Sequence, residues 1–477
     1  MRIMLIWPDG RPEVKIVIDA LQKEHEILYW VGEQPVSHLT PTGAIFHDHY
    51  DAWEGRPAEA YAGVVIDPPS AKTIASMHDT ESMILTMMDK HFGALHVDER
   101  KHIYYAQLGY WSRVVDDLKP DFIVFSLIPH TLYNSILYEI ARARGIPTLC
   151  FEDTWVTRHT LMYDDFRKGS DGIRRELFAL ANTPISVSDL PVDLQTYWSE
   201  QTTQHARTQP VYMTYQQNRG EGWGLFQHRL RVARKALQDG KLLNLLIRRV
   251  RRLGKKNLSI EYAEVVQKTD WSLPFVYFPL GTQPERTASP QGGIYADQIL
   301  AAETLAAALP EGSELWIKEH PSQWWLHSEN YSSARYPGYY HRLAKIPKVR
   351  IVPIQTDTFE LTERSKTTAV MTGTAGWEAL LRGKRPLVFG SPWFVDCPGV
   401  LRVDSVESCR EAFATFQKDP LVSKEDVLRF LKALDVSSIH ASLEVALEKR
   451  PQDIEEENIR LIAEAVSKRL RASVHAT

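Results

Sequence analysis

Short apolar runs separated by helical patterns fill the chain up to about residue 155. Residues 133–144 have apolar positions at helical spacing, and Gly145 and Pro147 end that pattern. Strand-length apolar runs that alternate with helices are typical of a parallel sheet covered by helices. The runs predicted to be strands are Ile3–Trp7, Ile27–Val31, Gly63–Ile66, Phe122–Ser126 and Thr148–Phe151.

The alternation stops between about residues 160 and 265. Residues 201–224 are polar and lack strand signals, whereas residues 226–256 are helical and basic, with a leucine-rich apolar side. Two interpretations of this basic segment stay open: a solvated helical surface, or an electrostatic dock for an anionic membrane or an acidic acceptor. Its basic residues are Arg229, Arg231, Arg234, Lys235, Lys241, Arg248, Arg249, Arg251, Arg252, Lys255 and Lys256.

The alternation of strands and helices resumes at Phe275. An alanine-rich helix is predicted over Gln298–Leu309, and an amphipathic helix is predicted in the 460s. The predicted strands are Phe275–Phe278, Glu314–Lys318, Val349–Val352, Ala369–Met371 and Leu387–Phe389.

A chain of 477 residues is too long for one hydrophobic core. We therefore expect an α/β protein with two Rossmann-like domains facing across a cleft, with a helical basic insertion. The expected domains are residues 1–265, which include the basic segment, and residues 266–477, which include the terminal helix.

The segment Met371–Gly390, MTGTAGWEALLRGKRPLVFG, predicts a strand, a tight turn, a helix and a second strand. Small residues from Thr372 to Ala375, with Gly373 and Thr374 between them, would expose backbone N–H groups where the helix begins. Such a helix N-terminus favours a phosphate group. Glu378, near the first turn, would meet a sugar hydroxyl. The alternative is an N-capped strand–helix–strand unit that binds no ligand.

Three further polar segments follow predicted strands of the second half, where open α/β sheets hold ligands. The first, FPLGTQPE, contains Gln283 and Glu285, and the second, KEHP, contains Lys318, His320 and Pro321. His320 would hydrogen-bond a phosphate and Lys318 would neutralise it, although a histidine such as His320, taken alone, is more often structural. The third segment is Ser391–Phe394.

In the first half, Glu152 and Asp153 follow the strand that begins at Thr148. Neighbouring carboxylates push their pKa values apart and can divide catalytic roles. We expect Asp153 to be the nucleophile or base and Glu152 to be structural, because adjacent strand residues point to opposite faces. The alternative for Asp153 is a cap of a turn.

Composition narrows the classes of function. The net charge of −4 argues against a general nucleic-acid binder, and the 44% of apolar residues argues against disorder. Three cysteines, Cys150, Cys397 and Cys409, lack metal-binding or disulfide spacing. The chain begins with an apolar strand-like run, and no apolar run reaches the roughly 18 residues that span a bilayer. We expect a cytoplasmic protein without a signal peptide, peripheral to the inner face of the membrane if the basic segment docks there.

Three of these motifs, FPLGTQPE, KEHP and the segment Met371–Gly390, together resemble the bacterial capsule polysaccharide biosynthesis family. That family includes the retaining β-Kdo transferases. The resemblance covers roughly residues 270–400, and it is weaker in the first half, where it depends on Phe151-Glu152-Asp153. It implies a glycosyltransferase of the GT-B type, with the nucleotide sugar in the second domain and a glycan or glycolipid acceptor in the first.

The same resemblance implies roles for individual residues. His320 and Pro321, and the turn of Thr372, Gly373 and Thr374, match the family's motifs for the donor nucleotide and phosphate. The acidic nucleophile of the Kdo branch falls on Glu152-Asp153. Thr154 and Trp155 follow here, where that branch continues with glycine. CMP-Kdo is thus one candidate donor, and the sugar stays open.

Neither a metal nor a cofactor is expected. The chain contains no D-x-D triplet, the metal-binding signature of the other transferase design, and a GT-B enzyme stabilises its leaving group with helix N-termini and basic side chains. The run His47-Asp48-His49-Tyr50-Asp51 resembles dinuclear metallohydrolases, but Ala52 stands where a further ligand is required. Two more functions stay open: a UDP-sugar epimerase of the same fold, and a non-catalytic nucleotide-sugar-binding subunit of a capsule complex.

Overall fold

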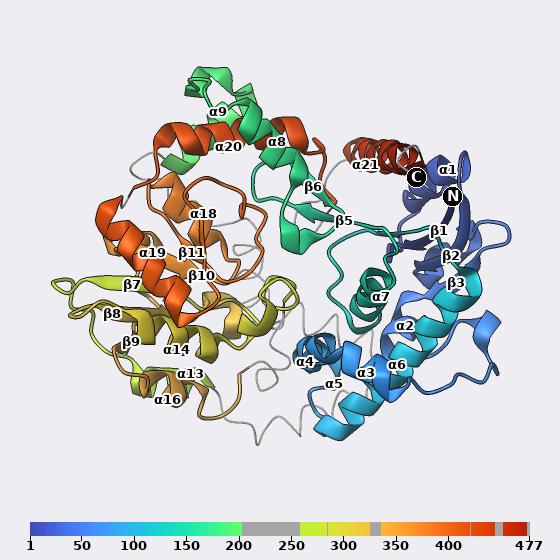
Figure 1. Cartoon of the computed structure of the whole chain (residues 1–477), viewed down its shortest axis with the longest axis horizontal. Coiled ribbons are helices and arrows are strands. Elements are labelled where there is room, and N and C mark those ends of the chain that lie inside the picture. The colour runs from blue at the N-terminus through green and yellow to red at the C-terminus, as the bar shows by residue number, and fades with distance from the viewer. Residues whose placement is uncertain (203–257, 284, 325–334, 420, 444–451, 475–477) are drawn as a thin grey trace, which may run out of the picture.

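The computed structural model of the chain describes residues 1–202, 258–283, 285–324, 335–419, 421–443 and 452–474. It contains two six-stranded sheets, one in each half of the chain, with helices on both faces of each (Figure 1). The predicted basic segment, residues 226–256, lies outside the described residues. None of the described helices is both long enough and apolar enough to cross a membrane.

The first sheet has the strand order β3-β2-β1-β4-β5-β6. Every neighbouring pair is parallel except β5 and β6, which form an antiparallel hairpin. Numbered along the chain, the order 3-2-1-4-5-6 is that of a Rossmann fold. The strands are β1 (Arg2–Ile6), β2 (Glu26–Gly32), β3 (Ile45–Asp48), β4 (Phe122–Phe125), β5 (Thr148–Asp153) and β6 (Thr160–Tyr163).

Alternate residues of β1 belong to two different cores, as the two-residue period of a strand requires. Met4 and Ile6 pack with α4 (His78–Met87), α6 (Val97–Leu118) and α7 (Leu132–Ala143). Ile3 and Leu5 pack with α1 (Val14–Gln22) and α21 (Gln452–Val474) on the other face. The remaining short helices of this half are α2 (His49–Glu54), α3 (Ala71–Ser76) and α5 (Asp89–Phe92).

The second sheet is parallel throughout and has the order β12-β11-β10-β7-β8-β9. Read from β9, this is again 3-2-1-4-5-6, so the predicted pair of Rossmann-like units is confirmed. The strands are β7 (Phe275–Pro279), β8 (Glu314–Lys318), β9 (Val349–Ile351), β10 (Thr367–Val370), β11 (Leu387–Val388) and β12 (Leu401–Arg402). Its helices are α13 (Leu258–Val265), α14 (Gln298–Ala308), α16 (Tyr339–Ala344), α17 (Thr358–Arg364), α18 (Thr374–Leu381) and α19 (Val406–Lys418).

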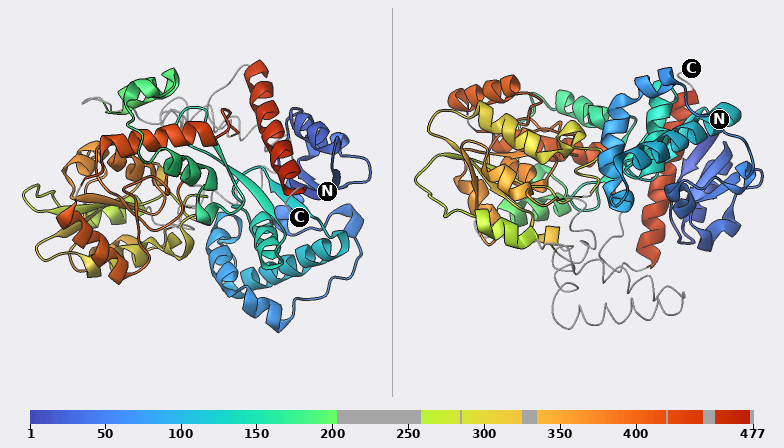
Figure 2. Two further views of the ribbon diagram at one scale, coloured as in Figure 1. Left: turned by 45° about the horizontal axis from the view of Figure 1, so that its top comes forward. Right: turned by 90° about the horizontal axis from the view of Figure 1, so that it is seen from below.

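The observed packing departs from the predicted domain boundaries in two parts of the chain. Each of these parts is assigned to one half by the boundaries but packs on the other half. Helix α8 (Asp171–Ala179) packs on α20 (Lys424–Ser437), and α9 (Val192–Thr202) reaches α18, where Trp377 Nε1 donates to Tyr197 OH at 2.8 Å. Helix α21 returns to the first sheet and packs along α1, as both views in Figure 2 show. The reason is burial: Ile462, Val466 and Leu470 of α21 complete the core beneath Ile3 and Leu5.

One predicted strand is absent from the described structure, and three strands, β3, β6 and β12, were not predicted. Residues 63–66 form no strand: Gly63 adopts a φ of +82°, and Val65 is 83% exposed, so this run has no sheet to join. The first sheet gains β3 instead, an edge strand with the mixed sequence IFHD. Strand β12 has only two residues, too few to give a periodic signal.

Candidate active site between the two halves

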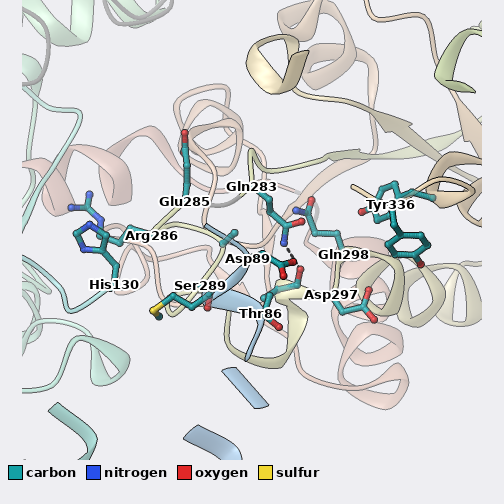
Figure 3. Close-up of a pocket in the computed structure, with 14 residues that line it drawn as sticks. Thr86, Asp89, His130, Gln283, Glu285, Arg286, Ser289, Asp297, Gln298 and Tyr336 are labelled. Carbon is teal, nitrogen blue, oxygen red and sulfur yellow. Dashed lines mark hydrogen bonds between the residues drawn. The ribbon is translucent and has the colours of Figure 1, made fainter. Parts of the chain in front are cut away.

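A cavity of about 270 Å³ lies between the two halves of the molecule (Figure 3). From the first half it is lined by Thr86 and Met87 at the end of α4, by Asp89 of α5, and by His130 in the loop after β4. From the second half it is lined by the loop between β7 and α14, and by Tyr336 and Tyr339. This wall at the carboxyl end of β7 is where an open α/β sheet holds a ligand.

The loop after β7 carries Gln283 and Glu285, both predicted site residues, into the wall of this cavity. Gln283 is held firmly, because its Nε2 donates to Ala296 O at 2.6 Å and its backbone N–H donates to Gln323 Oε1 at 3.0 Å. Glu285 is exposed. The next residue, Arg286, also lines the cavity and supplies a positive charge that the sequence interpretation did not single out.

A buried ion pair joins the first two motifs of the second half. Arg335 Nε lies 2.9 Å from Glu319 Oε2, and the side chains are 1% and 0% exposed. The same guanidinium donates to Gly281 O at 2.9 Å and to Gln283 Oε1, while Tyr340 OH donates to Glu319 Oε2 at 2.6 Å. Arg335 thus locks the loop after β7 to the end of β8. Its role was not predicted, because it lies outside both motifs.

Lys318 and His320, predicted to neutralise a phosphate, are both largely buried. Lys318 Nζ donates to Thr356 O at 2.6 Å and to Thr358 Oγ1 at 2.9 Å, so its ammonium group faces the start of α17. Burial lowers the pKa of Lys318 to about 8 and that of His320 to about 4. His320 is therefore neutral at pH 7. Pro321 begins the short 3₁₀ turn that follows.

The predicted phosphate turn lies between β10 and α18 as expected. Gly373 is the N-cap of α18, and Thr374 is the first helical residue. Thr372 Oγ1 donates to Thr287 O at 2.6 Å, which ties the turn to the loop that carries Arg286 and Ala288 in the cavity wall.

The two ends of this turn differ in how closely they are packed. A Cβ atom built on Gly373 would have no atom of the described residues within 4 Å, and its φ of −66° suits any residue. Ala375, in contrast, is buried. Within the described part of the chain, the buried Oε2 of Glu378 has no hydrogen-bond partner, and burial raises the pKa of this carboxyl.

The two predicted catalytic carboxylates lie in different surroundings. Glu152 is 4% exposed and faces the second half, since Gln291 Nε2 donates to its Oε1 at 2.7 Å and Tyr163 OH donates to its Oε2 at 3.1 Å. Gln291 is also bonded to the loop after β11, where its Nε2 donates to Ser391 O at 3.1 Å. Glu152 therefore lies at the junction of the two halves.

Asp153 points to the other face of β5. Its carboxylate accepts from Thr160 Oγ1 at 2.5 Å, from Ser442 Oγ at 2.5 Å and from the backbone N–H of Leu443 at 3.1 Å. These bonds attach the segment before α21 to the β5–β6 hairpin. The strand alternation was predicted, but the structure places Glu152, and not Asp153, against the second half.

The run from His47 to Asp51 does not converge on a metal site. His47 Nδ1 lies 2.7 Å from Tyr29 OH and its Nε2 lies 2.9 Å from Arg56 O, so both ring nitrogens are occupied. His49 Nδ1 contacts Tyr133 OH at 2.9 Å, and Asp51 pairs with Arg56. The metallohydrolase alternative has no support in this geometry.

A comparison with protein families finds one match, which covers part of the chain. Residues 286–433 match the family model described as capsule polysaccharide biosynthesis protein. Among curated proteins, no sequence matches the chain.

Solved structures give only distant similarity. The chain is similar to the KpsC β-Kdo 2,4 transferase of Thermosulfurimonas dismutans at 13% identity, over 66% of this chain and 79% of that one, with a TM-score of 0.33. It is also similar to the UDP-GlcNAc 2-epimerase of Methanocaldococcus jannaschii at 12% identity, over 91% and 99% of the two chains, with a TM-score of 0.24. The fold assignment therefore rests on the strand orders.

The matched region begins at Arg286 in the cavity wall and extends through β8 to α20, so it contains the KEHP motif and the turn at Thr372–Thr374. The resemblance predicted from the sequence is confirmed over residues 286–433, which match the family model.

Proposed function

We propose that this protein is a GT-B glycosyltransferase that moves a sugar from a nucleotide-sugar donor to a capsule or other surface-polysaccharide acceptor. The proposal is supported by the family match, by two Rossmann-like units and by a cavity to which both units contribute. The donor is held by the second unit and the acceptor by the first, and CMP-Kdo is one candidate donor.

The observation that carries this proposal is the open turn at Gly373. Neither its backbone angles nor its surroundings require glycine, because a Cβ atom there would meet no atom of the neighbouring described segments within 4 Å. A ligand that approaches the backbone would require it. A donor phosphate that accepts from the N–H groups at the start of α18 explains the missing side chain. Arg286 adds the positive charge that balances the leaving group, so transfer proceeds without a metal.

The carboxylate at the junction of the two halves is the proposed catalytic group. Glu152 faces the second half, where the donor would lie, whereas the bonds of Asp153 give it a positioning role. As a nucleophile, the Glu152 carboxylate would attack the anomeric carbon, the nucleotide would leave and a covalent glycosyl intermediate would form, with retention of configuration. As a base, it would take the proton of the acceptor hydroxyl and configuration would invert.

Substitution of Gly373 by valine tests the donor site. The protein should fold with an unchanged melting temperature, while its affinity for the donor should fall by a factor of about 10 or more, which corresponds to about 1.4 kcal/mol. Calorimetric titration with CMP-Kdo and with UDP-, GDP- and dTDP-sugars identifies the nucleotide and measures the loss.

Gly376→Val is the matched control, because a Cβ at Gly376 would lie 2.8 Å from Val370 Cγ2 and 3.0 Å from Phe394 Cζ. This variant should lose stability rather than affinity. Full donor affinity in Gly373→Val would refute the phosphate site. Release of nucleotide must also depend on an acceptor, since formation of an epimer without any acceptor would establish the epimerase instead.

The basic residues between 229 and 256 carry a further proposal, which rests on the sequence alone. They should bring the protein to anionic bilayers, where lipid-linked acceptors lie, at about 1 kcal/mol per well-placed basic residue. Sedimentation with liposomes that contain or lack anionic lipid, at low and high salt, measures this binding. Equal sedimentation with both kinds of liposome at both salt concentrations would exclude an electrostatic dock.

A further inference from the structure

Three potential metal ligands meet where the chain passes from the second half back to the first. His159 lies in the loop of the β5–β6 hairpin, Asp435 lies in the last turn of α20, and His440 follows that helix. Thr160 and Ile439 exchange backbone hydrogen bonds of 2.9 Å beside them, which brings the end of α20 to the hairpin (Figure 1). The cluster uses none of the residues that line the cavity between the halves.

The ring of His159 is oriented as a metal ligand. Its Nδ1–H donates to Thr157 O, which fixes the tautomer and leaves a lone pair on Nε2. The residue is 2% exposed, and within the described part of the chain Nε2 has no hydrogen-bond partner. This nitrogen faces the carboxylate oxygen of Asp435, an arrangement of two lone pairs that a cation between them would stabilise.

The spacing of the three ligand atoms fits one ion. Asp435 Oδ1 lies 3.7 Å from His159 Nε2 and 3.2 Å from His440 Nε2. Zinc bonds of about 2.0–2.2 Å place neighbouring tetrahedral ligand atoms about 3.4 Å apart. His440 Nε2 also donates to Asp435 O at 2.9 Å, and to bind the metal this exposed ring would give up that bond and carry its proton on Nδ1 instead.

The cations nearest the site contact atoms other than the three proposed ligand atoms. Lys432 Nζ lies 3.5 Å from Asp435 Oδ2, so Oδ1 stays directed toward the two rings. Arg158 is directed toward Glu457 and Asn458 instead. An adjacent cavity of about 290 Å³, lined in part by Asp193, offers room for water or a carboxylate as the fourth ligand.

We propose that His159, Asp435 and His440 bind one divalent zinc-type ion, which fastens the crossover after α20 to the β5–β6 hairpin. Imidazole and carboxylate ligands suit Zn²⁺. The ion joins segments from the two halves, so its expected role is to stabilise their connection rather than to take part in transfer.

Zinc titration of the chelator-treated full chain, without a polyhistidine tag, tests this site. The wild type should take up one equivalent of Zn²⁺ in competition with a chromophoric chelator, and its melting temperature should rise by about 2 °C or more with excess Zn²⁺. His440→Ala, which alters an exposed ring, and Asp435→Asn should each weaken zinc binding by about 10-fold or more.

His38→Ala is the matched control, because His38 is an exposed histidine of the first half, and it should bind zinc as the wild type does. A wild-type protein that takes up no equivalent of Zn²⁺ would overturn the proposal. Undiminished zinc binding in both His440→Ala and Asp435→Asn would also overturn it, because the ion would then lie elsewhere.

Discussion

At the scale of single residues, the proposed chemistry depends on which of Glu152 and Asp153 is the catalytic group. In Glu152→Gln, the remaining side-chain oxygen can still accept from Gln291, and the new amide group can donate to Tyr163 OH. We therefore expect this variant to fold. An amide can neither attack nor accept a proton, so the rate of transfer should fall by roughly 10²–10⁴-fold with donor affinity unchanged. Assay of sugar transfer together with donor titration measures both quantities.

Asp153→Asn is the matched control for that substitution. It weakens the bonds to Thr160 and Ser442, so we expect a lower melting temperature and a rate within about 10-fold of the wild type. The opposite outcome, an inactive Asp153→Asn beside an active Glu152→Gln, would restore the assignment made from the sequence. If both variants transfer sugar at the wild-type rate, the catalytic group lies elsewhere.

The sequence could predict that two adjacent carboxylates of β5 face opposite ways, but it could not predict which one faces the second half. That depends on Ser442 and Leu443, almost 300 positions further along the chain, which return to the hairpin and bind Asp153. The turn proposed to bind phosphate was easier to place in the fold, because strand, turn and helix are contiguous between Thr367 and Leu381. A site formed by contiguous residues can be located from the sequence, whereas a site formed by distant segments can be located only once the fold is known.

At the scale of elements, the lock between the loop after β7 and the end of β8 depends on Arg335. Substitution of Arg335 by methionine leaves the Glu319 carboxylate buried without its cation, so the free energy of unfolding should fall by about 3–5 kcal/mol. Urea denaturation measures this loss. Because Arg335 also holds Gln283, donor affinity should weaken as well.

Arg342→Met in α16 is the matched control for this lock. Arg342 is exposed and lies 3.7 Å from Glu303, which is exposed too, so its loss should lower the free energy of unfolding far less than the loss of Arg335 does. The double variant Glu319→Gln with Arg335→Met removes both charges, and it should recover part of the lost stability. Equal losses in Arg335→Met and Arg342→Met would contradict a structural lock.

Most strands of both sheets were predictable because their residues are buried on both faces. Ile3–Ile6 and Phe275–Phe278, for example, are continuous apolar runs in the sequence and central strands in the structure. The edges were not predictable: β3 contains His47 and Asp48, and residues 63–66 resemble a strand only in composition. Hydrophobic pattern thus predicts the centre of a sheet better than its edges.

At the scale of the whole molecule, one continuous core joins the two halves. The core that contains Ile136 of α7 also contains Leu194 of α9, Trp377 of α18 and Leu431 of α20. Proteins with two domains commonly unfold in stages. Here, helices α8 and α9 pack on the second half and α21 packs on the first, so neither half can unfold without exposing apolar surface of the other.

We therefore expect a single cooperative unfolding transition. Ile136→Ala and Leu431→Ala, at positions 1% and 0% exposed in different halves, should each lower the free energy of that transition by about 2–5 kcal/mol. Val436→Ala, at a position in α20 that is 55% exposed, is the control and should change it by no more than about 0.5 kcal/mol. Urea unfolding followed by circular dichroism and by tryptophan fluorescence measures the transition, and the two signals should coincide. Alternatively, Leu431→Ala could produce a separate early transition that is not seen in Ile136→Ala. In that case the two halves would unfold independently, and the shared core would contribute little to their association.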